Sequence, residues 1–492
     1  MSRRAICIVV AMIACAAADS GCGSSARTTT AAANTFEVAS GNLSGTRAAA
    51  GSGLRADNIA QLQVRWRFRL TDPPNSAGIF ASTPVVHGDT VYVEDLDSTV
   101  FALNRTTGKV RWTTRLLAPN GGPNGLAISG DRVYGATDSD VFALSAATGK
   151  ELWQRHLTSQ SEQFVDVAPI IWKGLVFIGT IGYQPRGRGA IYALDARSGT
   201  VRWRFVTIKG PWRRPWQAGG GGIWYPVSVD ASGLLYAGNS NPTPWGGSRS
   251  LPGGAAFPGP ALYTDSLLVL DARTGHLDWY DQVTPHDIRD YDFEATPILA
   301  SVGGAPLVIG AGKDGHVIAW NRDTHKRIWN AAVGLHRNDA GPLPNHRVTV
   351  CPGLYGGVET PMAYAAGRVF VPVDDLCGWG SATGRQSVNS ADPKRGRGEL
   401  IAIAAATGRR LWDRHLPAAD FGCATVANDV VLTSTYAGVV YAFAAGDGRL
   451  LWRARMPAGV NGCPAISGDL LLIGAGVAQS RASRPALLAY GL

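Results

Sequence analysis

A nine-residue segment, TPHDIRDYD at positions 284–292, concentrates side chains that can move protons or hold cations. It contains three aspartates, Asp287, Asp290 and Asp292, together with a histidine, an arginine and a tyrosine. Carboxylates act as general bases and as ligands of hard cations such as Ca²⁺. A run this polar is also typical of a solvated surface loop, so its interpretation depends on the elements that position it.

A motif that ends in tryptophan recurs along the chain and predicts those elements. Three clear copies read ALNRTTGKVRW, ALSAATGKELW and ALDARSGTVRW. Each predicts a strand, a tight turn whose glycine takes a positive φ, and a second strand. Two further β-rich runs precede each copy, so one unit is a four-stranded antiparallel sheet that must stack on its neighbours. The motif tryptophans, with a partial first copy, are Trp66, Trp112, Trp153, Trp203, Trp279, Trp329, Trp412 and Trp452.

The spacing of these tryptophans suits the blades of a β-propeller, in which they pack between blades and do not ligate a cofactor. The intervals 203–279 and 329–412 are longer than the rest, and insertions in repeat folds become loops, often on the binding face. After Trp452 three short strands remain without a tryptophan strand, while Trp66 ends a strand that lacks three partners. Joining the two ends predicts an all-β, eight-bladed propeller over residues 36–492 with a closed ring.

The N-terminus predicts export. Arg3 and Arg4 precede the short apolar run AICIVVAMIACAAA, and Cys22 follows small residues, as in bacterial lipoprotein signals. Residues 1–22 are thus expected to be a signal with a lipidation site, and residues 23–35 a flexible tether. We expect a cell-envelope lipoprotein attached to the outer side of the cytoplasmic membrane through lipidated Cys22. Secretion or a periplasmic location without lipidation is the alternative.

Composition limits the classes of partner. The net charge is +9 and the isoelectric point about 9.3, but the arginines are spread along the chain, so we expect no nucleic-acid partner. Cys351, Cys377, Cys423 and Cys463 lie outside the signal, an even number in an oxidising compartment. Cys351 and Cys377 flank a segment of one predicted blade and are expected to form a disulfide. The other two begin equivalent strands of neighbouring blades and either pair near the axis or stay reduced.

Together the repeat, the eightfold closure and the export signal resemble the pyrroloquinoline quinone (PQQ) quinoprotein family. The segment GGGGIWYPVSVD is similar to the one that places a tryptophan under the quinone ring, which implies Trp224 as the floor. GNSNPTPWGG resembles a calcium-binding segment and implies Asn241 as a ligand, with Asn239 as the neighbouring alternative. TPHDIRDYD matches the segment of the general base, here Asp290, beside the calcium. GAGKDGHVIAW carries Lys313, which is implied to hydrogen-bond the quinone oxygens and to stabilise the reduced cofactor.

The chain also departs from the family pattern. In GYQPRGRG, Gln184 stands at the position of a calcium-binding glutamate, and Arg188 of the same segment is a candidate cofactor contact. Asn124 stands where the family has an arginine that pairs with a PQQ carboxylate, and Asp166 takes the place of a hydroxyl residue. PQQ is a tricarboxylate, so the loss of an arginine and the gain of an aspartate both oppose its binding. The adjacent-cysteine disulfide of the family is absent from the sequence.

The resemblance implies an enzyme of the PQQ alcohol dehydrogenase type. We expect it to oxidise a small-molecule or polymeric alcohol, or a sugar, with PQQ and Ca²⁺, and to pass electrons to an external cytochrome or other acceptor. The alternative is a cofactor-free propeller scaffold of the cell envelope that binds protein partners. Arg289 replaces a usual tryptophan and either compensates in charge or forms a salt bridge with Asp287 or Asp292.

Overall fold

The protein is all-β in the computed structural model. The structure describes residues 35–49, 51–69, 81–120, 122, 125–158, 163–183, 186–209, 218–249, 252, 259–384, 393–478, 480 and 483–492. Besides strands, these residues include two short 3-10 helices, η2 (Ile59–Gln61) and η5 (Pro393–Arg395). No helix in the described ranges is long and apolar enough to cross a membrane.

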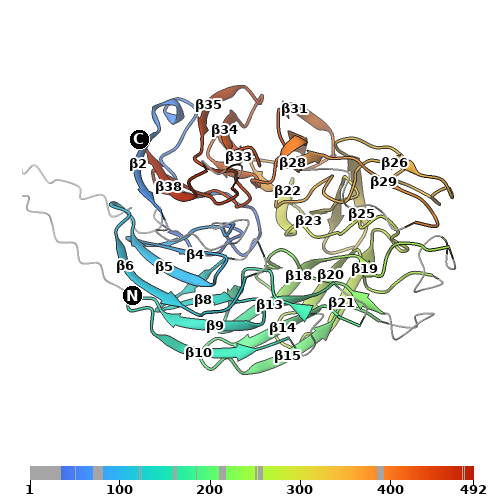
Figure 1. The fold of residues 1–492 in the computed structure, drawn as a ribbon, viewed down its shortest axis with the longest axis horizontal. Coiled ribbons are helices and arrows are strands. Elements are labelled where there is room, and N and C mark those ends of the chain that lie inside the picture. Colours follow the sequence, from blue (N-terminus) through green and yellow to red (C-terminus); the bar gives the residue numbers. More distant parts are fainter. Residues whose placement is uncertain are drawn as a thin grey trace, which may run out of the picture.

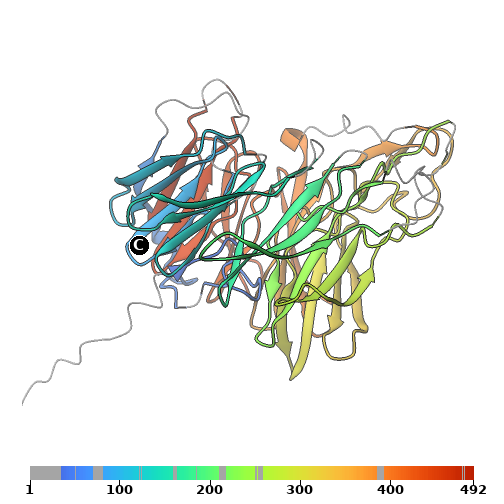
Figure 2. The same ribbon diagram turned by 90° about the horizontal axis from the view of Figure 1, so that it is seen from below.

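Eight blades, each built on four antiparallel strands, stand around a central axis, which confirms the predicted fold class (Figures 1 and 2). In chain order they are blade 1, β3 (Val85–His87), β4 (Thr90–Glu94), β5 (Thr99–Asn104) and β6 (Val110–Arg115); blade 2, β7 (Ala127–Ser129), β8 (Arg132–Ala136), β9 (Asp140–Ser145) and β10 (Glu151–His156); blade 3, β12 (Ile170–Trp172), β13 (Leu175–Gly182), β14 (Ala190–Asp195) and β15 (Val201–Val206); blade 4, β17 (Ser228–Val229), β18 (Leu234–Asn239), β20 (Ser266–Asp271) and β21 (Leu277–Gln282); blade 5, β22 (Ile298–Val302), β23 (Ala305–Ala311), β24 (His316–Asn321) and β25 (Arg327–Ala332); blade 6, β27 (Ala363–Ala365), β28 (Arg368–Asp375), β30 (Arg397–Ala404) and β31 (Arg410–Leu416); blade 7, β32 (Thr425–Ala427), β33 (Val430–Ser434), β34 (Val439–Ala444) and β35 (Leu450–Arg455); and blade 8, β36 (Ala465–Ser467), β37 (Leu470–Ala475), β38 (Ala486–Gly491) and β2 (Gln63–Phe68).

Several short strands lie outside the four-stranded blades. β1 (Thr35–Phe36) pairs with β3, and β11 (Gln163–Phe164) pairs with the end of β13. The two long tryptophan intervals contain two small ribbons, β16 (Gly219–Gly220) with β19 (Pro242–Thr243) and β26 (Val348–Val350) with β29 (Gly378–Gly380). The predicted insertions are therefore additions to blades 4 and 6.

The first strand of a blade lies near the axis. First strands of several neighbouring blades contact one another, as β22 contacts β27 and β27 contacts β32. The fourth strands are the most exposed: β6, β10 and β15 contain exposed and partly buried residues and no fully buried one. This order follows from the hydrophobic effect, because the inner strands are covered on both faces and the outer ones on a single face.

The ring is closed by a strand from the N-terminal part of the chain and the last strand. β2 pairs antiparallel with β38, and Trp66 lies opposite Ala489 in their register. Figure 1 shows blue β2 beside red β38. This pairing completes blade 8 and confirms the closure predicted from the unmatched strands at the two ends.

Each blade docks on the next through its tryptophan. The Trp153 indole N–H donates to the Ala196 carbonyl at 3.1 Å, and a Cβ added to Gly199 would lie 2.6 Å from the indole. Gly199 has a φ of +68°, so glycine serves both the turn and the close contact. The same bond to the next blade is made by Trp66, Trp112, Trp203, Trp329 and Trp412.

Two junctions differ for identifiable reasons. Between blades 4 and 5 the turn glycine is replaced by His325, and the Trp279 indole stacks on its ring with centroids 4.6 Å apart. Blade 8 has the ends of β38 and β2 where the other blades have a turn. Trp452 of blade 7 therefore packs edge-to-face on Tyr490 of β38, with centroids 5.2 Å apart.

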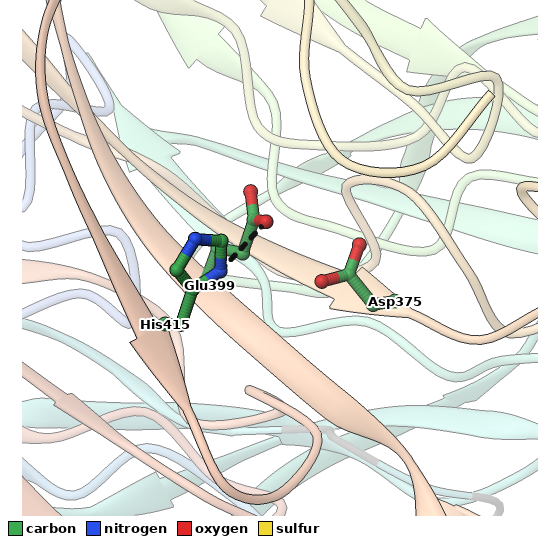
Figure 3. Close-up of side chains that lie close together, drawn as sticks. All are labelled: Asp375, Glu399 and His415. Carbon is green, nitrogen blue, oxygen red and sulfur yellow. Dashed lines mark ion pairs between the residues drawn. The ribbon is translucent and has the colours of Figure 1, made fainter.

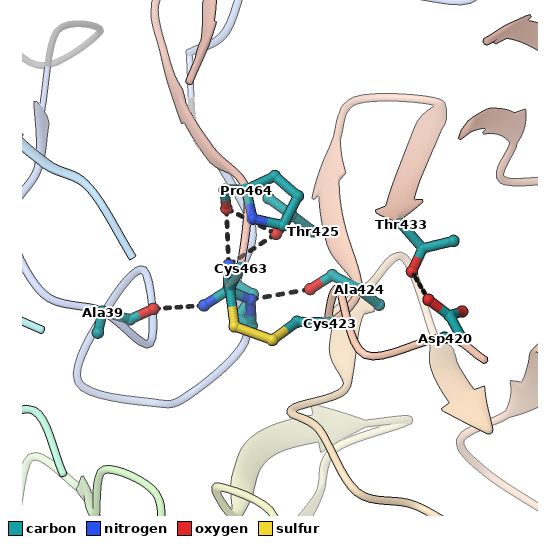
Figure 4. The surroundings of a disulfide bond; sticks show 9 residues. Ala39, Asp420, Cys423, Ala424, Thr425, Thr433, Cys463 and Pro464 are labelled. Atoms are coloured by element: carbon teal, nitrogen blue, oxygen red, sulfur yellow. Dashed lines mark hydrogen bonds between the residues drawn. A yellow bond between two sulfur atoms is a disulfide. The ribbon is translucent and has the colours of Figure 1, made fainter. Parts of the chain in front are cut away.

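An N-terminal strap, residues 37–49, crosses the inner strands. Strap carbonyls accept hydrogen bonds from the backbone N–H groups of Ile128, Val229, Leu299, Tyr364 and Val426, one residue in the first strand of each of five blades. The buried Arg47 guanidinium donates to the carbonyls of Ala39, Ala424 and Pro464. Figure 4 shows these three acceptors gathered around a disulfide. The strap therefore joins the ring across the axis.

The structure contains two disulfides, the expected one and one of two alternatives. Cys351 pairs with Cys377, with Cα atoms 4.4 Å apart. Cys423 pairs with Cys463, with Cα atoms 5.1 Å apart, so of the two alternatives for this pair the bonded one holds (Figure 4). The second bridge joins the entries to the inner strands of blades 7 and 8.

The docking glycines make a direct prediction. Gly199→Ala should destabilise the fold more than Gly88→Ala, although both glycines have positive φ, because the new methyl group at residue 88 meets nothing within 4 Å. Both variants lose about 1–2 kcal/mol for an L-residue in this conformation. Gly199→Ala should lose roughly a further 1–3 kcal/mol from overpacking against Trp153. Urea unfolding measures both, and equal losses would contradict the docking role.

Candidate active site at one end of the axis

Three connections bring the predicted site residues to one end of the propeller. Asp290 lies in the loop between β21 and β22, that is, between the outer strand of blade 4 and the inner strand of blade 5. Lys313 lies in the turn between β23 and β24, and Asn241 follows β18. In an antiparallel four-stranded blade the entry to the first strand and the turn after the second lie at the same end. Residues distant in sequence therefore converge there.

Asp290 is at the centre of a hydrogen-bonded cluster. One of its carboxylate oxygens accepts a hydrogen bond from the Asn241 side-chain amide, and the other lies 3.1 Å from Lys313 Nζ. Lys313 Nζ also lies 2.5 Å from Asp292 Oδ2. Asp292 Oδ1 in turn accepts the Asn241 backbone N–H at 2.8 Å. The structure thus brings Asp290, Lys313 and Asn241 together, with Asp292 as the residue that holds the other two.

The charges of this cluster are tuned by burial. Burial raises the pKa of Asp290 to about 6, although the Lys313 ammonium opposes the shift. Burial would lower the pKa of Lys313, but Asp290 and Asp292 outweigh it and hold that pKa well above its usual value. Lys313 is therefore a cation, and Asp290 is a carboxylate of raised basicity whose side chain is 14% exposed. Such a group can take a proton from a hydroxyl group that lies against its exposed edge.

The other residues of the TPHDIRDYD loop hold its shape. The Asp287 carboxylate accepts the backbone N–H groups of Arg289 and Tyr291 at 2.8 and 2.9 Å. The Tyr291 hydroxyl donates to the Pro352 carbonyl at 3.0 Å. The Arg289 guanidinium donates to the carbonyls of residues 338, 340 and 341. Of the two alternatives for Arg289, the salt bridge to Asp287 or Asp292 is not formed among the described residues. Its guanidinium instead makes these backbone contacts with the insertion of blade 6, which lies over the loop.

Trp224 and Asp166 line the same end from blades 4 and 3. Trp224 is half-buried and packs edge-to-face on Phe164, with centroids 5.7 Å apart. Asp166 is 3% exposed and lies against the backbone of Gly122. Burial alone raises the pKa of Asp166 to about 7.

The other residues predicted for the site lie outside the described residues or do not contact the Asp290 cluster. Asn124 and Gln184 lie outside the described residues. The Arg188 side chain is exposed, and its backbone is bridged to Gly220 in the glycine run before Trp224. The Asn239 amide donates to the carbonyls of residues 207 and 263, so Asn241 and not Asn239 contacts Asp290.

Two acids that the sequence interpretation missed complete the site. Glu294 and Glu359 both interact electrostatically with Lys313, and burial raises the pKa of Glu359 to about 7 and that of Glu294 well above its usual value. Each precedes the Thr-Pro pair that opens an inner strand, in FEATP and VETP. An acid one or two residues before the Thr-Pro pair in two consecutive blades is the signal that would have identified them.

The donors and acceptors of this end fit a flat polar group with carboxylates and carbonyls. In the described part of the chain, Trp224 Nε1, Asp166 Oδ1, Glu294 Oε1 and Glu359 Oε1 are buried and lack a protein partner. Buried polar atoms need one, and a bound group can supply it. Burial raises the pKa of all three acids, so each can carry a proton at a higher pH than an exposed carboxyl and can then donate to a carboxylate as well as accept. The oxygens of Asp290 and Asn241 suit a hard cation.

Comparison with known families agrees with this geometry. A model described as the glucose/ethanol/alcohol dehydrogenase β-propeller domain matches residues 156–333, which include Trp224, Asn241, Asp290 and Lys313. A second, described as outer membrane protein assembly factor BamB, matches residues 54–214 and 396–484, about half of the chain. The chain belongs to the PQQ-repeat β-propeller family. The family contains both enzymes and an assembly factor by these descriptions.

Relatives in this family include named alcohol dehydrogenases. Quinohemoprotein alcohol dehydrogenase ADH IIB of Pseudomonas putida is 30% identical over 310 residues, 56% of this chain and 44% of the relative. Quinohemoprotein alcohol dehydrogenase of Comamonas testosteroni is 28% identical over 466 residues, 78% of this chain and 64% of the relative. The chain thus spans between 44% and 64% of the length of these relatives.

Solved structures share the fold. The Comamonas testosteroni enzyme superposes with a TM-score of 0.80 at 22% identity, over 94% of this chain and 81% of that one. A europium-containing methanol dehydrogenase gives 0.79 at 20% identity, over 93% and 98%. BamB from Moraxella catarrhalis gives 0.56 at 14% identity, over 88% and 98%. These likenesses establish the propeller architecture.

The buried Asp166 predicts a pH dependence of stability. Its pKa is about 7 in the folded protein and near 3.8 in an exposed aspartate, so the folded state binds the proton more tightly. The free energy of unfolding should therefore fall as pH rises from about 4 to about 7. Asp166→Asn, which stays neutral, should be more stable than the parent at pH 8, by at most about 4 kcal/mol.

Urea unfolding between pH 4 and pH 8 measures this effect. The control is Asp131→Asn, since the Asp131 side chain is 93% exposed and its replacement should leave the pH dependence unchanged. A difference between Asp166→Asn and the parent that does not vary with pH would show that Asp166 is not held neutral by burial.

Proposed function

We propose that this protein is an exported quinoprotein dehydrogenase that oxidises the hydroxyl group of an alcohol, a sugar or a polymer. The observation that carries the proposal is the Asp290 cluster: a partly accessible carboxylate of raised pKa, held by Lys313 and Asn241. It lies at the axial end that is also lined by Trp224. Alcohol oxidation needs a base for the hydroxyl proton and an acceptor for the hydride, and the two must act together.

The chain's residues divide the work of holding a cofactor and a metal. Trp224 would support the flat ring of PQQ, while Lys313, Asp166 and the protonated Glu359 would hydrogen-bond its oxygens. Asn241 and Asp290 would ligate Ca²⁺, and Gln184 is proposed as a further ligand. When bound, PQQ supplies a two-electron acceptor and Ca²⁺ supplies a Lewis acid.

The side chains of the protein would carry out the proton transfer of the reaction. Asp290 would accept the proton of the substrate hydroxyl as the hydride leaves the carbinol carbon, which yields the carbonyl product. Lys313 keeps Asp290 in place and, through its positive charge, favours the ionised form of this base. The two electrons would then leave to an external cytochrome or other acceptor, and the proton to solvent through the exposed edge of Asp290.

A cofactor-free envelope scaffold is the second candidate function. It is favoured by the match of the BamB model to about half of the chain. Asp166, Glu294 and Glu359 also add carboxyl groups to this end, which would repel a tricarboxylate at any pH where they are ionised. Residues 1–22 and Cys22 are proposed to direct export and membrane attachment under either function.

A substitution at Asp290 distinguishes the dehydrogenase from the scaffold. Asp290→Asn should abolish PQQ- and Ca²⁺-dependent dye-linked oxidation of alcohols, by about 100-fold or more, because an amide cannot accept the proton. Asparagine tolerates the positive φ of 67° at this position and keeps a ligand oxygen, so the quinone absorbance spectrum should persist. Titration of the purified protein with PQQ, with and without Ca²⁺, measures both properties.

His286→Ala in the same loop is the matched control, since His286 is exposed, and its turnover should equal that of the parent. If the parent itself shows neither a bound-quinone spectrum nor turnover with Ca²⁺ present, the dehydrogenase proposal fails and the scaffold stands. If Asp290→Asn retains full turnover, Asp290 is not the base.

A further inference from the structure

A second cluster of ionisable side chains lies in blade 6, away from the axis. Glu399 of β30 and His415 of β31 are directly opposite each other in the register of these strands, and Asp375 ends the adjacent strand β28. One ligand atom from each of the three lies within 4.8 Å of the others. Figure 3 shows His415 and Glu399 joined by an ion pair and Asp375 across from Glu399.

The strand register explains why these side chains share one face. Glu399 lies opposite Val373 of β28, and Asp375 is two residues further along the same strand. Alternate residues of a strand point to the same side, so Asp375 is the diagonal neighbour of Glu399. The cluster is thus built into three neighbouring strands of a sheet, which hold their Cα positions firmly.

One oxygen of each carboxylate in this cluster has no hydrogen-bond partner among the described residues. Glu399 is 6% exposed, and its Oε2 is buried without a partner in the described residues. Asp375 Oδ1 and Asp413 Oδ1, from the same region, are also buried and lack a partner there. His415 Nδ1 lies 3.0 Å from Glu399 Oε1 and satisfies one oxygen only. Neighbouring carboxylates repel unless a cation or a proton lies between them.

We propose that Asp375, Glu399 and His415 bind a divalent transition-metal ion such as Zn²⁺. Zinc–ligand bonds of about 2.0–2.2 Å place ligand atoms roughly 3–4 Å apart, which the cluster reaches with a small closure of its longest separation. An imidazole nitrogen with two carboxylates suits zinc and related ions better than Ca²⁺ or Mg²⁺, which prefer oxygen ligands throughout. The His415 side chain is 76% exposed, so water completes the coordination.

The position of the site indicates what the ion does. Asp375 lies at the end of β28, and Cys377, two residues later, forms the disulfide to Cys351 at the base of the blade 6 insertion. A cation there would tie β28, β30 and β31 together where the inserted segment leaves the sheet. The inferred role is structural, and it does not depend on the proposed dehydrogenase function.

Blade 2 provides a natural control. His156 of β10 lies opposite Asp140 of β9, and its Nδ1 is 3.0 Å from Asp140 Oδ1, the same distance as in the His415–Glu399 pair. Among the described residues, only the blade 6 cluster places three such ligands so close together. The comparison therefore separates a cross-strand histidine–carboxylate pair from a three-ligand site.

The test is isothermal titration of the metal-free full chain with ZnCl₂. We expect a saturable site that Glu399→Gln and His415→Ala each weaken by about 100-fold or more, since loss even of an outer partner of a metal site costs about 10–100-fold. His156→Ala should bind like the parent. Zinc should also raise the thermal midpoint of the parent and not that of His415→Ala, which alters an exposed side chain and should fold normally.

The outcomes are distinct from those for the axial site. Asp290→Asn should retain zinc binding here whether or not the dehydrogenase proposal holds. Equal zinc affinity in the parent, Glu399→Gln and His415→Ala would overturn the site. So would an absence of saturable binding, which would mean that the two carboxyls share a proton and hold no metal.

Discussion

The contact between the tryptophan of one blade and the turn of the next, made at six of the eight junctions by an indole hydrogen bond, is the interaction on which this structure depends. A blade is a sheet with one exposed edge strand, and it cannot cover its own faces. The indole covers the turn, donates to a backbone carbonyl and requires a glycine beneath it, as at Trp153 and Gly199. Because the geometry repeats, the rotation between blades repeats, and the ring closes at eight without an open sheet edge.

Closure in turn decides where chemistry can be placed. The turn between the third and fourth strands of a blade is constrained by its contact with a tryptophan. The connections that enter the first strand or follow the second strand do not make this contact, and the Asp290 loop, the Lys313 turn and the Trp224 segment are connections of these two kinds. The junction between blades 4 and 5, where Trp279 stacks on His325 in place of a turn glycine, lies between the two blades that carry these three segments. The inner strands are also crossed by the strap, which Arg47 anchors to blades 7 and 8.

The repeat made the fold predictable, down to the pairing of β2 with β38, because every copy predicts the same strand, turn and strand. Trp224, Asn241, Asp290 and Lys313 were predictable for another reason: each lies in a contiguous motif similar to a known one. Glu294, Glu359 and Arg47 were not found, since their significance arises from convergence at the axis and no single motif contains them. The contacts of Arg289 depended on the course of an insertion 50 residues later, which no local pattern describes.

A chain with a net charge of +9 thus gathers several acids around the cation Lys313 at one end of its axis. The two facts are compatible because charge on the surface remains solvated, whereas buried acids of raised pKa become neutral donors. Lys313 stands as a cation between Asp292, which is almost fully buried, and Asp290, whose side chain keeps a partly exposed edge. Burial, more than the count of charges, therefore selects which of several similar carboxylates can act as a base.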